Sequence, residues 1–242
     1  GDGAPGGRYR RVRMSYLATR FLDVDFADIL ANTPQAKVYD IEPQIRALTK
    51  CTPCPKPEDI PCQGAALVDW LGDNDAGRAT LMISYGWGYE VLKIVDALKA
   101  HSNRCDVPLR DVIVWICCLC INLHRVQQAR AQGKDVPFEK FRQEFGDRVA
   151  GIGSVVALLS PWQNPLYITR VWCVYELFEA TTNARVNLEL VLHSSDEADL
   201  RIQLSRGSGM TELWRTLADL DIQNALASVE SDRRSIFKLI QE

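Results

Sequence analysis

Short apolar runs alternate with amphipathic stretches along most of the chain after residue 78. Four runs have the length and composition of buried strands, at residues 79–85, 111–121, 154–160 and 186–193. Helical spacing of apolar residues follows the first three, over 89–101, 138–149 and 168–182. Strands that alternate with helices predict an α/β fold, in which helices cover both faces of a parallel sheet.

The fourth run differs from the others because its apolar residues alternate with polar ones. They are Val186, Leu188, Leu190 and Leu192. This pattern predicts a strand near the edge of the sheet. Ser194 and Glu197 then have the spacing of a capping box, which predicts that a helix starts here. Helical spacing returns over 210–218 and 230–241.

The region before the first of these strands has a less regular pattern. Short helices are expected near 16–31 and 64–71, and residues 51–62 between them hold four prolines, which predicts a loop. Residues 1–13 are rich in glycine and arginine. We expect a flexible, solvated lead-in there, with an acidic surface as the alternative contact for its four arginines. The predicted organisation is the lead-in at 1–13, an N-terminal extension over 14–76 and one α/β domain over 77–242.

Composition and charge narrow the classes of function. The 242 residues carry a net charge of -3, so no overall positive field favours nucleic acid. No apolar run approaches the roughly 20 residues that a membrane span needs. Three of the eight cysteines lie in the run 111–121, where neighbouring side chains of a strand would point to opposite faces. Free thiols in a reducing compartment, the cytoplasm or an organelle, fit this better than a disulfide framework.

Two cysteine patterns raise the question of metal or thiol chemistry. The spacing of Cys51, Cys54 and Cys62 resembles the first half of a zinc site, but no matching second pair of ligands follows them. Cys120 lies four residues before His124, a spacing that matches no nucleophile motif. We therefore predict a proline-rich loop with incidental thiols, a cysteine that serves packing, and no metal site.

The most informative segment is residues 154–180. A buried strand is followed by a loop with Pro161 and Pro165. A helix then carries Trp172 and Glu176, which lie four residues apart and share one face. Open α/β sheets keep their ligand sites at the carboxyl ends of their strands. Burial beside an indole would raise the pKa of Glu176 and suit it to act as an acid, a base or a hydroxyl-binding group. A structural hydrogen bond to a loop is the simpler alternative.

The turn after the first strand, residues 84–88, is a second candidate. Gly86 and Gly88 permit close approach to the backbone, and the next helix presents its N-terminus there. The turn lacks the glycine pattern of dinucleotide-binding folds, and no phosphate-loop pattern occurs. A ligand-facing loop and a turn shaped only by packing are equal alternatives.

Several motifs in this order resemble the Toll/interleukin-1 receptor-like (TIR-like) superfamily. They are SYGW at 84–87, VWICCLCINLH at 114–124, IGSVVALLSPW at 152–162 and YITRVWCVYEL at 167–177. The resemblance covers about residues 79–242 and points to the divergent branch of algae and protists that often precedes tetratricopeptide or kinesin-light-chain-like repeats. The W-C-x-x-E-L element at 172–177 is its most specific part, and the CIN element is also similar to fungal heterokaryon-incompatibility domains.

The resemblance implies a flavodoxin-like three-layer sandwich with about five parallel strands, and signalling through protein partners or self-association. Some members of the superfamily cleave NAD at the nicotinamide–ribose bond. In that case Glu176 would be the catalytic residue that binds the ribose hydroxyls. The residues expected to line the same cleft are Ser84, Tyr85, Gly86, Trp87 and Trp172. NAD would then be a substrate, and no cofactor is required.

Two departures from this branch weaken the enzymatic interpretation. Cys117 stands where the branch usually has an aspartate, and Leu123 where it often has a glutamine, so polar groups are missing from the rim of the cleft. We therefore expect a signalling or scaffold module that acts through protein–protein contacts. An NAD glycohydrolase that uses Glu176 and an accessory subunit of a larger assembly are the alternatives.

Overall fold

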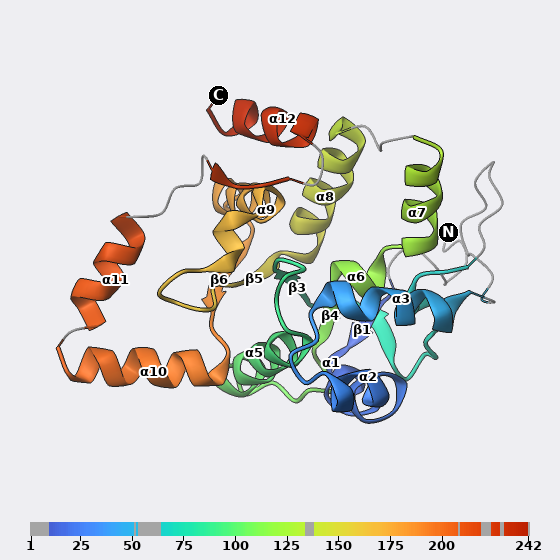
Figure 1. Cartoon of the computed structure of the whole chain (residues 1–242), viewed down its shortest axis with the longest axis horizontal. Coiled ribbons are helices and arrows are strands. Elements are labelled where there is room, and N and C mark those ends of the chain that lie inside the picture. The colour runs from blue at the N-terminus through green and yellow to red at the C-terminus, as the bar shows by residue number, and fades with distance from the viewer. Residues whose placement is uncertain are drawn as a thin grey trace.

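A mixed sheet forms the centre of the molecule. The computed structural model describes residues 10–50, 52, 64–133, 138–207, 209–218, 224–227 and 230–241. The sheet has six strands in the order β2-β1-β4-β3-β5-β6 (Figure 1). The strands are β1 (Arg10–Arg13), β2 (Ala76–Arg78), β3 (Leu81–Ser84), β4 (Ile113–Trp115), β5 (Ser154–Leu158) and β6 (Asn187–Val191). The predicted α/β class is confirmed.

The four strands expected from the apolar runs lie side by side and run parallel. β3 pairs with β4 and β5, and β5 pairs with β6. β3 and β5 are apolar on both faces because neighbouring residues enter different hydrophobic clusters, as Met82 and Ile83 of β3 do. β6 lies at the edge of the sheet, as predicted, and its Leu190 is 58% exposed.

The expectation of a purely parallel sheet is wrong. β1 pairs antiparallel with both β2 and β4. Val12 in β1 is fully buried between its neighbours, while Arg10 reaches out and donates a hydrogen bond to Asp73. The flexible lead-in predicted for 1–13 is therefore wrong for residues 10–13, because a central valine and two neighbouring strands fix them in the sheet. The residues before them lie outside the described part of the chain.

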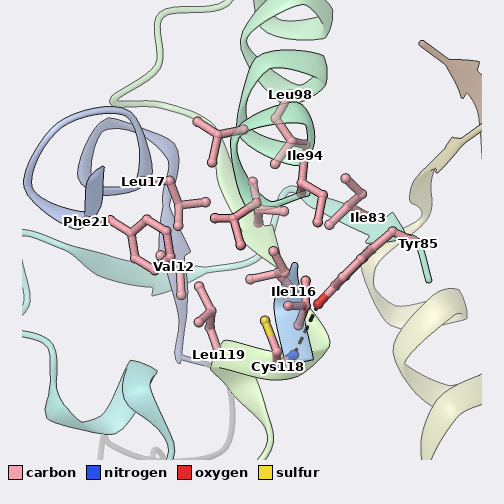
Figure 2. Close-up of a cluster of buried hydrophobic side chains, with 14 of the residues drawn as sticks. Val12, Leu17, Phe21, Ile83, Tyr85, Ile94, Leu98, Ile116, Cys118 and Leu119 are labelled. Carbon is pink, nitrogen blue, oxygen red and sulfur yellow. Dashed lines mark hydrogen bonds between the residues drawn. The ribbon is translucent and has the colours of Figure 1, made fainter. Parts of the chain in front are cut away.

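The N-terminal extension shares its hydrophobic core with the rest of the chain. Figure 2 shows Val12, Leu17 and Phe21 beside side chains of β3, of α5 (Val91–Arg104) and of the segment that follows β4. β2 also crosses the boundary expected at residue 76. The lead-in thus contributes β1 to the sheet, β2 spans the end of the extension, and the extension supplies part of the core.

Helices cover both faces of the sheet. One face packs against α5 and against α1 (Met14–Ala18), the π-helix η1 (Phe21–Asp25), α2 (Ala27–Asn32), α3 (Val38–Thr49) and α4 (Leu67–Trp70). The other face packs against α8 (Phe138–Ile152), α9 (Val171–Thr182) and α12 (Glu230–Gln241), which lie together in Figure 1. The remaining helices are α6 (Cys117–Cys120), α7 (Leu123–Ala131), the 3-10 helix η2 (Leu166–Thr169), α10 (Ser194–Ser205) and α11 (Gly209–Ala218). Among the residues described, no helix has both the length and the apolar character that a membrane crossing requires.

Some local expectations differ from the structure. Residues 117–120 form α6 instead of the end of the second strand, because an unbroken apolar run has no period that separates strand from helix. α10 begins at Ser194 as expected, but not through a capping box. Asp96 of α5 instead accepts hydrogen bonds from the backbone N–H (2.6 Å) and the hydroxyl (3.0 Å) of Ser194. Nearly all of the loop predicted at 51–62 lies outside the described residues.

Candidate functional site

Glu176 and the turn at residues 84–88 meet at the carboxyl end of β3. Ser84, the last residue of β3, donates a hydrogen bond from its hydroxyl to Oε2 of Glu176 on α9. The Ser84 hydroxyl also shares a hydrogen bond of 2.7 Å with the hydroxyl of Tyr167 in η2. The proximity expected between this turn and Glu176 is therefore confirmed, and Tyr167 is a third member that the sequence analysis missed.

A second hydrogen-bonded tyrosine holds η2 against the sheet. The hydroxyl of Tyr89 donates to the carbonyl oxygen of Leu158 at the end of β5 (2.9 Å) and accepts from the backbone N–H of Tyr167 (3.0 Å). Tyr167 is fully buried and Tyr89 is almost so. The segment after β5 is thus fixed by both residues, and this fixes the position of the Tyr167 hydroxyl beside Ser84.

Gly86 allows α9 to approach the turn closely. A β-carbon on Gly86 would lie 3.4 Å from Cγ of Arg170, the residue before α9. That distance is at the tight end of ordinary contact, so a larger side chain would push Arg170 away. An alanine at this position would therefore make only an ordinary contact, and the ligand-facing role of the glycine stays a prediction.

Burial changes the proton affinity of the carboxyl group of Glu176. The burial of Glu176 raises its pKa well above the usual range of a glutamic acid, because the charged form loses its hydration. Ser84 supplies one hydrogen bond to the carboxyl group. While it is protonated, such a carboxyl group can donate a hydrogen bond or a proton, and after ionisation it can accept hydrogen bonds from hydroxyl groups.

Tyr85 and Trp87 contact Cys117, which stands at the position where the resemblance expects an aspartate. Sγ of Cys117 lies 3.2 Å from the hydroxyl of Tyr85 and accepts a hydrogen bond of 3.2 Å from Nε1 of Trp87. The backbone N–H of Cys118 donates to the Tyr85 hydroxyl (3.4 Å), the dashed line in Figure 2. Burial raises the pKa of Cys117 to about 11. The residue is therefore a neutral thiol and not an anionic group.

Trp172 packs mainly with aromatic and apolar side chains. Its ring lies edge-on to that of Tyr175, with centroids 5.8 Å apart, and it belongs to the cluster between the sheet and α8, α9 and α12. The expected effect of burial on the pKa of Glu176 is borne out. The role of Trp172 in lining a ligand cleft stays a prediction.

A surface pocket lies next to this network. Its volume is about 280 Å³, and it lies between η2 with its preceding loop and α11. The lining residues are Gln163, Asn164, Pro165, Ile168, Glu212, Arg215 and Thr216. η2 therefore takes part in both features, with Tyr167 in the Ser84 network and Ile168 in the pocket wall.

The thiol–base pair considered for Cys120 and His124 has little support. Nε2 of His124 lies 2.9 Å from the hydroxyl of Thr49, and its ring lies against Gly64, where a β-carbon would clash with it. Burial raises the pKa of Cys120. These contacts favour the packing interpretation. The three cysteines at 51, 54 and 62 lie outside the described residues.

A group that could hold a metal ion was missed by the sequence analysis. His101, Cys105 and Glu189 each offer a ligand atom, and these atoms lie within 4.8 Å of one another. The i, i+4 spacing of His101 and Cys105 was visible in the sequence, but Glu189 comes from a distant strand.

Comparison of the chain with protein-family models, with curated proteins and with solved structures finds no match.

Proposed function

We propose that this chain is a TIR-like module that acts through protein–protein contacts and that it self-associates through α10 and α11. The observation that carries the proposal is a group of large apolar side chains that these two helices expose. They are Ile202, Leu204, Met210 and Trp214, and Trp214 is 65% exposed. Met210 and Trp214 lie four residues apart and share one face of α11, and contiguous exposed apolar groups mark interaction surfaces more often than single exposed residues do.

The order of the parallel strands supports the TIR-like assignment. In chain order, β3, β4, β5 and β6 are the first to the fourth parallel strands, and their spatial order is β4-β3-β5-β6. This 2-1-3-4 order begins the flavodoxin-like arrangement 2-1-3-4-5. Together with the quoted motifs it supports a divergent member of that class, with β1 and β2 added at one edge.

The charges of α11 suit a second copy of the same chain. Glu212 and Arg215 lie three residues apart on α11, and both line the pocket between α11 and η2. In a twofold contact the same surface meets itself, so Glu212 of one copy is able to face Arg215 of the other. Exposed aromatic residues such as Trp214 are also enriched at the energetic centres of interfaces.

Sedimentation analysis over a range of concentrations tests this proposal. We expect concentration-dependent self-association of the native chain and at least about tenfold weaker association of Trp214→Ser, because an aromatic anchor in an interface typically contributes more than about 1.4 kcal/mol. Val24→Ser is the matched control, since Val24 is 67% exposed on η1, away from this surface.

Charge reversal gives a stricter test of the twofold geometry. Glu212→Arg and Arg215→Glu should each weaken association, and the double variant should recover it, because the opposite charges again face each other. A native chain that stays monomeric at every concentration, or a Trp214→Ser variant that associates normally, would contradict the proposal.

The second candidate function is cleavage of NAD at the nicotinamide–ribose bond. The observation in its favour is a carboxyl group with a raised pKa that is hydrogen-bonded to Ser84 at the carboxyl edge of the sheet. In this reaction, Glu176 would bind the ribose hydroxyls. Trp87 and Tyr85 would contact the rest of the substrate.

Nicotinamide release from NAD, followed at high protein concentration, tests the second function. We expect Glu176→Gln to abolish the release and Glu179→Gln, one turn further along α9, to leave it unchanged. Absence of nicotinamide release from the native chain in its associated form would exclude the enzymatic function and leave the scaffold function in place.

A further inference from the structure

Three side chains with metal-binding atoms converge between α5 and the edge strand β6. His101 lies in the last turn of α5, Cys105 follows directly as its C-cap, and Glu189 lies in the middle of β6. One nitrogen, one sulfur and one carboxylate oxygen lie within 4.8 Å of one another. We propose that these three residues bind a zinc ion, with water as the fourth ligand.

The distance between two of the ligands already suits a shared ion. Nδ1 of His101 and Oε2 of Glu189 are 3.4 Å apart. Two ligands that each lie about 2.05 Å from a tetrahedral zinc ion are separated by about 3.3 Å. These two residues therefore need almost no movement to bind one ion.

Cys105 needs a larger adjustment. Its Sγ lies 3.9 Å from Nε2 of His101, so it is closer to the other ring nitrogen. Cys105 is exposed at the end of a helix, where its side chain is able to change rotamer at low cost. The proposed site requires a rotation that moves the sulfur toward Nδ1, which would complete a set of three ligands.

An independent observation concerns one nitrogen of the imidazole, Nδ1, which has no hydrogen bond although Glu189 lies nearby. His101 is only 8% exposed, and its Nδ1 is buried without a hydrogen bond. A buried polar atom without a partner is costly and rare in native proteins. A metal ion between His101 and Glu189 would satisfy this nitrogen.

The chemistry of the three ligands selects the ion. Mg²⁺ and Ca²⁺ prefer oxygen ligands, whereas imidazole nitrogen and thiolate sulfur are typical ligands of zinc. The amide of Asn187 donates a hydrogen bond to the other oxygen of Glu189 (3.1 Å), so the carboxylate is held in orientation as in many metal sites. The exposure of Cys105 and Glu189 gives the ion a path from solvent.

Spectroscopy with Co²⁺ in place of zinc tests the proposal. The background for all measurements is a chain with Cys51, Cys54 and Cys62 changed to Ser, so that these three closely spaced cysteines do not bind the ion. We expect one Co²⁺ per chain, a near-ultraviolet thiolate-to-cobalt band and the visible spectrum of a tetrahedral ion. Zn²⁺ should displace the Co²⁺ and raise the melting temperature by about 5–10 °C at a hundredfold excess over Kd.

Variants at the exposed ligands identify the site. Cys105→Ser should remove the thiolate band, and Glu189→Gln should weaken binding at least about tenfold, because loss of even an outer contact to a ligand costs about 10–100-fold. Glu230→Gln, a change of the same kind on α12, should have no effect. Both ligand variants are at the surface, and circular dichroism checks that they fold. Absence of the band in the background chain, or its persistence in Cys105→Ser, would overturn the proposal.

Discussion

The surroundings of Glu176 and the outer helices α10 and α11 depart in opposite ways from the usual distribution of polar and apolar groups. Around Glu176, polar side chains are buried and bonded to one another: Ser84 contacts both Glu176 and the hydroxyl of Tyr167. On α10 and α11, apolar side chains such as Met210 and Trp214 are exposed. Buried polar groups are costly unless they are hydrogen-bonded, and exposed apolar groups gain nothing from folding, so the two regions should respond differently to substitution.

The two regions should differ in how much a substitution changes the free energy of unfolding. A buried polar network adds to stability only while its partners stay in place. A buried polar group that loses its partner has given up its hydration without gaining a hydrogen bond, and this lowers the free energy of unfolding. An exposed apolar side chain contributes little to folding and is free to be changed. Substitutions near Glu176 should therefore alter stability, and those on α11 should alter association. The predictions below test this contrast, from the largest expected effect to the smallest.

The largest effect is expected at Tyr167, which is fully buried. Tyr167→Ala should lower the free energy of unfolding by about 3–5 kcal/mol, because it leaves a cavity. Tyr167→Phe keeps the ring and loses only the hydroxyl group that bonds Ser84, so it should cost about 1 kcal/mol. Urea denaturation of both variants measures the two values. Equal losses would mean that the hydroxyl network, and not packing, determines the stability of this region.

The second effect is a pH dependence that comes from Glu176. Its pKa is raised in the folded chain above the ordinary value of 4.5, so folded Glu176 keeps its proton while the unfolded chain has lost it. The free energy of unfolding should therefore fall as pH rises above about 4.5, by no more than about 1.4 kcal/mol per pH unit, until the folded pKa is passed.

The variant Glu176→Gln isolates this contribution. It cannot ionise, so its stability should increase relative to the native chain as pH rises through the same range. Denaturation curves at pH values from 4.5 upward measure the difference. A difference that stays constant with pH would show that the carboxyl group is already solvated in the folded chain.

The third prediction concerns Trp214 on α11, where a substitution should change the free energy of unfolding only slightly. Trp214→Ser should change the free energy of unfolding, measured at a concentration where the chain is monomeric, by no more than about 0.5 kcal/mol, because Trp214 is 65% exposed. The result contrasts with that of Tyr167→Ala. A loss of several kcal/mol would mean that Trp214 supports the fold and would weaken its proposed role in association.

The smallest expected effect is on the local stability of α11. The hydroxyl of Thr216 on α11 donates a hydrogen bond to the carbonyl oxygen of Gln163 (3.1 Å) at an exposed site. Thr216→Val should speed hydrogen exchange of α11 about twofold, since one exposed hydrogen bond contributes about 0.5 kcal/mol, the low end of the usual range, and leave α9 unchanged. Hydrogen-exchange mass spectrometry compares the two helices. Equal changes in both would mean that α11 unfolds together with the core.

Much of the fold was predictable where the sequence has a clear period or a long apolar run. The runs around β3 and β5 predict strands, and the spacing in α5 and α9 predicts helices, because these patterns depend on which faces are buried. Where the run had no period, at α6, the prediction was wrong. β1 was missed because its arginines suggest a solvated tail, although Val12 between them is buried in the sheet.

The candidate site was predictable only in part. The meeting of Ser84 and Glu176 follows from the rule that parallel strands carry their sites at one edge. Tyr167 was missed since its position depends on how η2 folds back, and this is fixed by the hydrogen bonds of Tyr89. Trp172 was expected beside Glu176 from spacing alone, but aromatic packing against Tyr175 also determines the place of its ring.

The sequence by itself determined the α/β class, the parallel strands and the residue that lies at their carboxyl edge, because periodicity and local preferences act over a few residues. Only the tertiary structure decided the addition of β1 and β2 to the sheet, the partners of Glu176 and the approach of Glu189 to His101 and Cys105. Each of these depends on contacts between residues far apart in the chain, and such contacts form only when the elements have packed.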